Sequence, residues 1–144
     1  MRGAAPAQIR LLSTQHVGLL ATAPAGLFDG PVTAASAEKY LSDPRNLMAG
    51  AVSGDMLVGF ASALDHHHPD KPGELWINEI SVLEAHRRQG IGRALIACLR
   101  AHARLQGLAT VWVLAEARDP AACAFYRAIG ATADETVMFT YAPP

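Results

Sequence analysis

The chain has little of several residue types that mark common classes of protein. Only two of its 144 residues are cysteines, Cys98 and Cys123, and they form no CxxC pair. A disulfide framework is therefore excluded, and we expect a reducing, cytoplasmic compartment. Twelve basic residues stand against thirteen acidic ones, so the net charge of −1 provides no general attraction to nucleic acid. Lysine is scarce among the basic residues, and arginine favours recognition of fixed anions such as phosphates.

Long hydrophobic runs are also missing. The longest early stretch without charge, Leu11 to Phe28, is interrupted by polar residues, glycine and proline, which makes it too polar to span a membrane. No compact apolar segment follows Arg2, so we expect no export signal. Hydrophobic residues make up 51% of the chain and charged residues 17%, a composition that favours a folded core over disorder. At this length we expect one domain over residues 1–144.

Capping and turn residues divide the chain into helices and strands. Ser13 or Thr14 can cap a first short helix, and Thr33 can cap a second helix that ends before Pro44. The compact turn 53–55 joins two strands of a hairpin. Apolar periodicity predicts strands at 8–12, 46–52, 56–64, 75–83, 110–115 and 131–141, and further helices at 90–106 and 119–130. This order predicts an α/β fold, a mixed sheet with helices on both faces.

The segment from Val82 to Leu95 carries the clearest chemical signal. A strand ends, a turn follows, and Gly90 and Gly92 open a long amphipathic helix. Unpaired N–H groups and the helix dipole create positive potential at such a helix start, and glycine allows a ligand to approach the backbone. Formal charge comes from three arginines, Arg87, Arg88 and Arg93. The segment suits a pyrophosphate.

Two other phosphate motifs and a purely structural interpretation fit this segment less well. A P-loop requires a lysine, but none follows Lys71, and a dinucleotide fingerprint requires a third glycine where Leu95 stands. A plain strand–turn–helix with solvated arginines is the alternative. In that case two glycines in the first helical turn would lower the stability of the helix and serve no function.

The pattern Arg87-x-x-Gly90-x-Gly92 resembles the (Q/R)xxGxG/A signature of the GNAT superfamily of N-acetyltransferases, which bind acetyl-CoA. The strand end before it, 80–82, and the block 119–130 with its tyrosine also resemble that family. The resemblance covers Leu75 to Tyr141 strongly and the first half through its element order alone. It implies a single GNAT-like domain with a mostly antiparallel sheet of about six to seven strands.

A closer similarity is to the aminoglycoside 3-N-acetyltransferases of this superfamily. It rests on four segments, Trp76-Ile77-Asn78-Glu79, His86-Arg87-Arg88-Gln89-Gly90-Ile91, Asp119-Pro120-Ala121 with Tyr126, and Val137-Met138-Phe139. The chain departs from these enzymes at the acidic position, which is more often Asp and here is Glu79. It departs again in its first helices and in the 65–74 loop, so the reaction class transfers better than the substrate.

The resemblance implies roles for individual residues. Acetyl-CoA would bind to residues of the strand end, the glycine turn and the second block: Ile80, Ser81, Val82, Arg87, Arg88, Gln89, Gly90, Ile91, Gly92, Arg93 and Asp119. Glu79 lies mid-strand among apolar residues, where partial desolvation would raise its pKa and suit it to act as a general base. An ion pair or a surface position is the alternative. Tyr126 would be the general acid that protonates the CoA thiolate, and a core aromatic is the alternative for it.

Other reactive residue types give weaker signals. Cys98 lies on the apolar side of its helix, and neither cysteine has an evident histidine partner, so we expect direct transfer without an acetyl-cysteine. Three histidines follow one another at 66–68. Because adjacent residues cannot easily all bind one ion, we expect a polar loop tip and no metal site.

The first half bears weakly on the acceptor. Residues 1–74 hold seven acidic side chains against five basic ones, which is compatible with an acidic rim for a cationic amine and equally with ordinary surface charge. We predict an N-acetyltransferase that acts by direct attack on a small amine, with an aminoglycoside 3-amino group as one option. A peptide or protein N-acetyltransferase and a non-catalytic CoA-binding homologue remain alternatives, and a peptide acceptor would need an open groove instead of a closed acidic pocket near Glu79. We expect no nucleic-acid or membrane partner, and a homodimer stays open.

Overall fold

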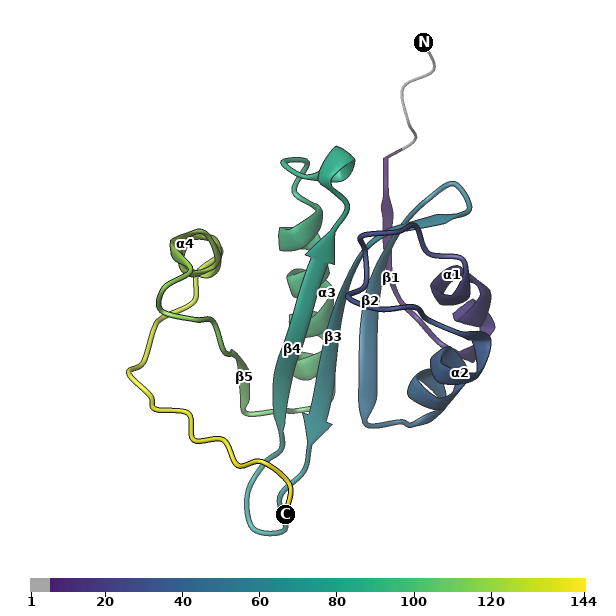
Figure 1. Ribbon diagram of the computed structural model, residues 1–144. Coiled ribbons are helices and arrows are strands. Elements are labelled where there is room, and N and C mark those ends of the chain that lie inside the picture. Colours follow the sequence, from purple (N-terminus) through teal and green to yellow (C-terminus); the bar gives the residue numbers. More distant parts are fainter. Residues whose placement is uncertain (1–5) are drawn as a thin grey trace. The chain divides into compact units, whose positions relative to one another are not determined.

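The computed structural model describes residues 6–144 (Figure 1). Residues 1–5, on which the expectation about an export signal rests, lie outside the described part. The chain divides into two compact units, Met1–Leu114 and Ala115–Pro144. Each unit is described by itself.

The first unit is built on a five-stranded sheet in the order β1-β2-β3-β4-β5. The strands are β1 (Gln8–Leu11), β2 (Asn46–Ser53), β3 (Met56–His66), β4 (Glu74–Val82) and β5 (Thr110–Val113). The first four pair with antiparallel neighbours, and β5 pairs with β4 in parallel. Five of the six predicted strands therefore form, and the sheet is mixed and mostly antiparallel as expected.

The sheet is smaller than the predicted six to seven strands. Residues 131–141 form no strand in the structure, and Val137, Met138 and Phe139 are 77%, 72% and 81% exposed. β-Branched and aromatic residues favour extended backbone, but a strand also needs a neighbour to complete its hydrogen bonds. Among residues 6–144 no strand pairs with this segment.

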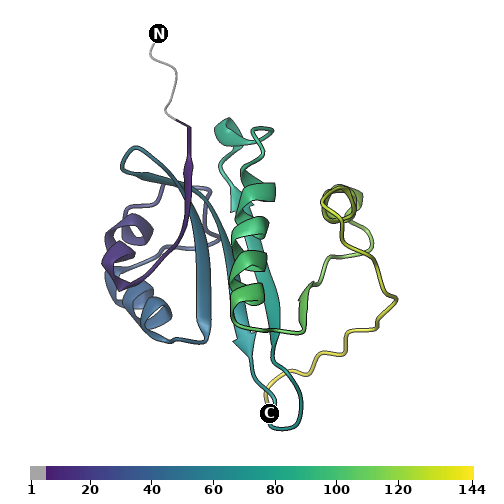
Figure 2. The same ribbon diagram turned by 180° about the vertical axis from the view of Figure 1, so that it is seen from behind.

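Helices cover both faces of the sheet, as the sequence predicts. α1 (Val17–Ala21) follows a short 3-10 turn, η1 (Thr14–His16), and α2 (Ala34–Ser42) begins after the capping side chain of Thr33. Both helices pack on one face around Phe60. The next residue back, Gly59, faces Ile91 at the start of α3 (Ile91–Leu105), so α3 covers the opposite face (Figures 1 and 2).

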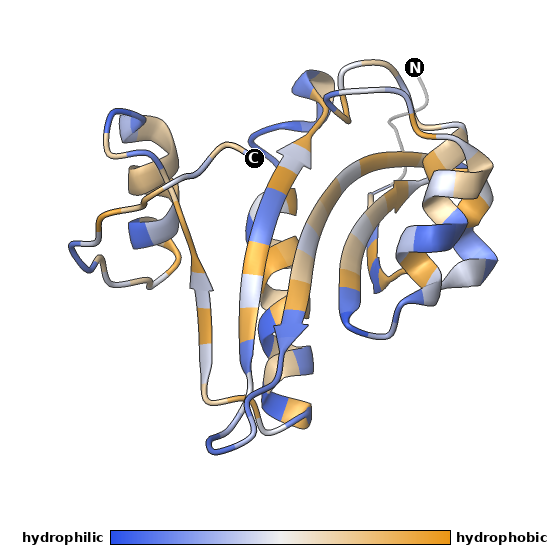
Figure 3. Cartoon of the chain, turned by 60° about the horizontal axis from the view of Figure 1, so that its bottom comes forward, coloured by the Kyte–Doolittle hydropathy of each residue, from blue (hydrophilic) through white to orange (hydrophobic). Residues whose placement is uncertain are grey.

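The core follows from the apolar character of the central strands. β2 and β3 are apolar over most of their length, whereas apolar and polar segments alternate along α3 (Figure 3). Four of the five buried side chains of α3 recur at steps of four, Ile91, Leu95, Leu99 and Ala103, and with the fifth, Ile96, they form the apolar side of the helix. No helix within residues 6–144 is long and apolar enough to cross a membrane.

The second unit holds one helix, α4 (Pro120–Ala128). Its start follows the predicted pattern, because a carboxylate oxygen of Asp119 accepts a hydrogen bond from the N–H of Ala122 at 3.0 Å. Pro120 occupies the first helical turn, and Gly130, with φ +97°, lies just beyond the end.

Candidate active site

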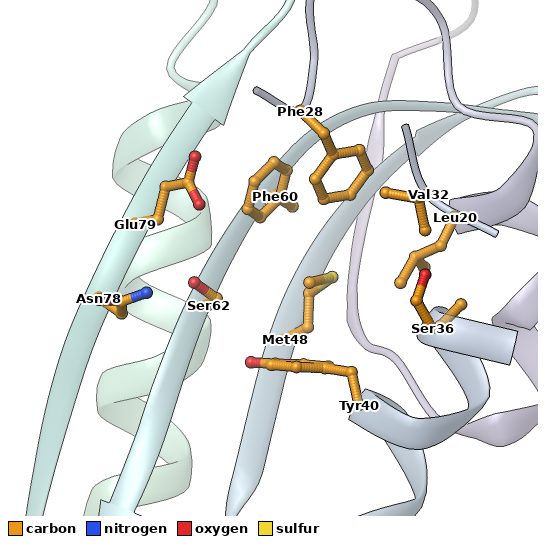
Figure 4. Close-up of a pocket in the computed structure, with 11 residues that line it drawn as sticks. Leu20, Phe28, Val32, Ser36, Tyr40, Met48, Phe60, Ser62, Asn78 and Glu79 are labelled. Carbon is orange, nitrogen blue, oxygen red and sulfur yellow. The ribbon is translucent and has the colours of Figure 1, made fainter. Parts of the chain in front are cut away.

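A β-bulge in β4 places two consecutive side chains on one face of the sheet. Ser62 of β3 pairs with Glu79, but the next residue, Ala63, pairs with Ile77, so Asn78 is an extra residue in β4. In a regular strand neighbouring side chains alternate between faces. Because the bulge interrupts that alternation, Asn78 and Glu79 both point into the pocket on the face covered by α1 and α2 (Figure 4).

This pocket has a volume of about 230 Å³. Its walls come from α1, α2, the segment between them, and strands β2, β3 and β4 (Figure 4). Most of the lining side chains are apolar, and Phe28 and Phe60 stack with their ring centroids 4.4 Å apart. The lining residues are Leu20, Phe28, Val32, Ser36, Ala37, Tyr40, Met48, Phe60, Ser62, Asn78 and Glu79.

Glu79 is the acidic residue of the pocket wall. Burial raises the pKa of its carboxyl group, and the negative charge of Asp29 raises it further. A carboxylate with a raised pKa binds a proton more strongly than an ordinary surface glutamate, which suits a general base. The surroundings predicted for Glu79, partial burial among apolar neighbours, are therefore present.

Two hydroxyl groups in this pocket, those of Tyr40 and Ser62, differ in their hydrogen bonding. The Tyr40 hydroxyl donates a hydrogen bond to the carbonyl of Leu47 at 2.7 Å, and burial, with a smaller contribution from the charge of Glu79, raises its pKa to about 12. Tyr40 is therefore neutral at physiological pH. The Ser62 hydroxyl is buried and has no hydrogen-bond partner within the described part of the chain. Since a buried polar group usually has a partner, Ser62 is available to a polar group of a ligand.

Beyond the bulge, one edge of β4 is open. β5 pairs with β4 from Glu74 to Ile77 only, whereas β3 continues to pair with β4 as far as Val82. Within residues 6–144, no strand covers the β5 side of β4 from residue 78 onwards. An extended ligand can bind to such an edge through main-chain hydrogen bonds.

The glycine turn follows this edge and leads into α3. Arg88 and Gly90 adopt left-handed backbone with φ values of +62° and +77°, and a Cβ built on Gly90 would meet no atom within 4 Å. The Ala94 N–H donates to the carbonyl of Gly90 at 3.0 Å, so the N–H groups of Ile91 and Gly92 lie before the first helical hydrogen bond. The turn therefore offers space and positive potential for an anion.

Not every residue predicted to bind acetyl-CoA directs its side chain toward a ligand. The Arg87 side chain donates from Nε to the carbonyl of Val82 at 3.0 Å, which ties the turn to the end of β4. The Ser81 hydroxyl donates to the carbonyl of Leu27 at 2.8 Å. The Ile91 side chain is buried, and a Cβ on Gly59 would lie 3.2 Å from its Cγ2. Ser81 and Ile91 therefore keep the backbone for contact with a ligand, whereas the exposed Arg87 side chain also has its terminal N–H groups.

The predicted site residues fall into two groups. Glu79, the strand end 80–82 and the turn 87–93 lie consecutively in the first unit, where Arg88, Gln89 and Arg93 are exposed. Asp119 and Tyr126 belong to the second unit, where Asp119 caps α4 and burial raises the pKa of the Tyr126 phenol. A raised pKa keeps that phenol protonated, as a proton donor must be.

Sequence reasoning missed most of the pocket wall. Phe28, Tyr40, Ser62 and Asn78 lie in the pocket, but they are far apart in the chain and carry no shared spacing. The bulge that turns Asn78 inward depends on pairing between β3 and β4. Of the two cysteines, Cys98 has its thiol pKa raised by burial, which disfavours the thiolate that covalent catalysis would need.

Residues 19–131 match the model of the acetyltransferase (GNAT) family. A related chain, the uncharacterized protein ML0378 of Mycobacterium leprae (strain TN), is 31% identical over 127 residues, which cover 87% of this chain and 34% of that protein. The chain thus spans about a third of the length of the curated relative that it matches.

Solved structures share the fold at lower identity. An aminoglycoside acetyltransferase, meta-AAC0020, from an uncultured soil metagenomic sample superimposes with a TM-score of 0.81 at 22% identity, covering 96% of each chain. A ribosomal-protein-alanine N-acetyltransferase from Brucella melitensis biovar Abortus 2308 gives a TM-score of 0.76 at 25% identity, covering 94% of this chain and 99% of the other. The aminoglycoside N-acetyltransferase AAC(6')-Iy, in complex with a bisubstrate analog, gives 0.82 at 20% identity and covers 97% and 100%.

Proposed function

The chain belongs to the acetyltransferase (GNAT) family, and from this premise we propose that it transfers the acetyl group of acetyl-CoA to the primary amine of a small cationic acceptor. Membership confirms the GNAT fold predicted from the sequence, and it supports an acetyl-CoA-dependent N-acetyltransferase as the class of enzyme. The acceptor, the roles of the residues and a cytoplasmic location belong to the proposal.

One observation carries the choice of acceptor. Glu79, with a raised pKa, lies at the wall of a pocket of about 230 Å³, and Asp29 adds a second negative charge close to it. No lysine or arginine is among the residues that line the pocket within the described part. Two negative charges without a cationic neighbour attract a protonated amine.

The size and walls of the pocket restrict the acceptor further. Its volume is below the range of roughly 300–1,000 Å³ that is typical of sites enclosing drug-sized ligands. It therefore suits the amine-bearing end of a molecule, a single ring or a short chain, while the rest lies outside. Stacked Phe28 and Phe60 offer that end an apolar surface, and the Ser62 hydroxyl offers it one polar contact.

In the proposed reaction the Glu79 carboxylate takes one proton from the bound ammonium group, and the resulting neutral amine attacks the thioester carbonyl directly. The C–N bond forms, the C–S bond breaks, and the second proton of the nitrogen passes to solvent. The CoA thiolate takes a proton from the Tyr126 hydroxyl, which regains one from solvent. Acetyl-CoA is held by the open edge of β4 at residues 80–82 and by the turn 87–93, whose left-handed Gly90 leaves room for the pyrophosphate.

A second candidate acceptor is the N-terminus of a peptide. One structural relative is described as a ribosomal-protein-alanine N-acetyltransferase, and a small apolar pocket suits a first residue with a small side chain. The two candidates differ in what must lie outside the pocket, a sugar or alkyl body in one case and an extended backbone in the other.

A screen for free thiol release from acetyl-CoA tests the proposal. The panel contains aminoglycosides, a polyamine, an arylalkylamine and a short peptide that begins with alanine, and NMR locates the acetylated amine, including the predicted 3-amino group. Turnover of a small amine supports the proposal, and turnover of the peptide alone supports the second candidate. Tight acetyl-CoA binding without turnover of any amine would favour a non-catalytic homologue. Analytical ultracentrifugation tests the homodimer.

A further inference from the structure

The connection between β3 and β4 brings two histidines and a glutamate together. His66, the last residue of β3, pairs directly with Glu74, the first residue of β4. His68 lies two residues after His66, and its Nε2 is 3.4 Å from Oε2 of Glu74. The rings of His66 and His68 stack with centroids 4.6 Å apart. Three donor groups that are not consecutive in sequence thus meet at one end of the sheet, the lower end in Figure 1.

The middle histidine does not belong to this cluster. The Nε2 of His67 lies 3.3 Å from Oδ1 of Asp65. Asp65 also lies 4.0 Å from His102 of α3 through its other carboxylate oxygen. Because the rings of His66 and His68 stack on each other while the His67 ring lies against Asp65, His67 stands apart from the pair. The objection that adjacent histidines cannot bind one ion therefore does not apply to this pair.

We propose that His66, His68 and Glu74 form a binding site for a divalent transition-metal ion, zinc in the first place. One ligand atom from each residue lies within 4.8 Å of the other two. Around a tetrahedral zinc ion, ligand atoms lie about 3.3 Å apart, because each bond is about 2.0–2.1 Å long. A shift of the ligand atoms by roughly 1.5 Å would bring them to the spacing of a zinc site. His66 is exposed, so its side chain can rotate to provide this shift.

The donor types select the ion. Two imidazole nitrogens and one carboxylate oxygen are ligands that zinc commonly takes, with water in the fourth position. Magnesium and calcium require mostly oxygen ligands, and copper(I) prefers thiolate or thioether sulfur. Because copper(II) and nickel(II) also bind imidazole, we expect the site to take them in vitro as well.

The ion would act on the fold and not on acetyl transfer. Glu74 is about 16 Å from Glu79 along β4, at about 3.3 Å of rise per residue. The bound ion would join the ends of β3 and β4 and fix the 67–73 loop between them. It would thereby resist fraying of the hairpin, and this role is independent of the proposed function.

Calorimetry with zinc chloride on a chelator-treated chain without a histidine tag tests the site. We expect one zinc ion per chain, and we expect His68→Ala and Glu74→Gln to weaken binding by more than about 100-fold. His67→Ala is the matched control, because it removes an adjacent imidazole outside the cluster, and it should bind zinc as the parent does. Glu74→Gln conserves size, and circular dichroism of the metal-free variants shows whether each remains folded.

Two further measurements distinguish this site from zinc binding elsewhere on the chain. Zinc should raise the melting temperature of the parent and of His67→Ala, but not that of Glu74→Gln. Cobalt(II) substituted for zinc should show the visible spectrum of nitrogen and oxygen ligands. A thiolate-to-cobalt band would assign the ion to Cys98 or Cys123 and overturn the proposal. Absence of zinc binding by the parent, or unchanged binding by His68→Ala and Glu74→Gln, would overturn it as well.

Discussion

The substitution Glu79→Gln distinguishes two roles of the Glu79 carboxylate: a general base that takes a proton from the amine, or a negative charge that only binds a cationic acceptor. The amide has nearly the same shape as the carboxylate, so the packing against the pocket wall is kept, while the proton acceptor and the negative charge are lost. If Glu79 takes the proton of the amine, kcat/KM should fall by roughly 10²–10⁴, the usual contribution of a positioned acid or base. If it only attracts a cationic acceptor, KM should rise while kcat stays unchanged.

The pH profile of the same variant gives an independent test. Burial and the charge of Asp29 raise the pKa of Glu79, and a base works only when it is deprotonated. The kcat/KM of the parent should therefore rise with pH through a pKa above the ordinary glutamate value. In Glu79→Gln this rise should vanish, and activity should recover only at higher pH, where more of the acceptor amine is already neutral.

Thiol release under saturating acetyl-CoA, with the acceptor varied, measures kcat and KM separately. Glu38→Gln is a suitable control, because Glu38 is an exposed carboxylate on α2 and does not line the pocket. It should keep the activity and the pH profile of the parent. If Glu79→Gln kept full activity and the same rise of kcat/KM at low pH (the acid limb of the profile), Glu79 would not be the general base. Catalysis would then rest on positioning alone.

Three further substitutions test the surroundings of this residue and the acetyl-CoA site. In Asp29→Asn the lost negative charge should lower the pKa of Glu79, so the acid limb of kcat/KM should move to lower pH; an upward shift would contradict the electrostatic argument. Gly90→Val should weaken acetyl-CoA binding in calorimetry, whereas Gly107→Val, which imposes the same left-handed strain beyond the far end of α3, should not. Tyr126→Phe should lower kcat with acetyl-CoA affinity nearly intact, and by less than Glu79→Gln because water can partly replace the acid; an unchanged kcat would exclude that role.

Local signals account for most of the elements that could be predicted from the sequence. Thr33 caps α2, Pro44 limits its end, and Gly107 follows the end of α3 with a positive φ. Each of these preferences acts within a few residues. The glycine turn belongs to the same class, since the left-handed backbone at Gly90 depends on the residue itself.

Features that depend on distant pairing could not be predicted. The 131–141 segment has strand-forming residues, but nothing in its sequence specifies a neighbour. Phe28 and Tyr40 reach the pocket because α1 and α2 pack on the sheet. Glu74 lies next to His66 because of the register between β3 and β4. The spacing of the histidines in the sequence gives no information about this register.

The bulge at Asn78 connects the pocket with the open edge of β4. Pairing with β5 stops at Ile77, the residue just before the bulge, and a bulge bends its strand and increases the local twist. We infer that the bulge both turns Asn78 and Glu79 toward the pocket and separates the end of β4 from β5. A regular strand would lose both effects.

Deletion of Asn78 tests this inference. Ile77 and Glu79 would then follow one another and remain opposite Ala63 and Ser62, so the register with β3 and the core would be kept. Because the straightened strand would misplace residues 80–82 relative to the pocket, kcat/KM should fall on the order of 10²-fold, the cost of an error of about 1 Å in positioning. Asn78→Ala keeps the bulge and removes only the amide, so it should lose much less activity. Thiol release measures both variants, and circular dichroism verifies their fold. If the folded deletion variant were as active as Asn78→Ala, the bulge would not be what positions acetyl-CoA.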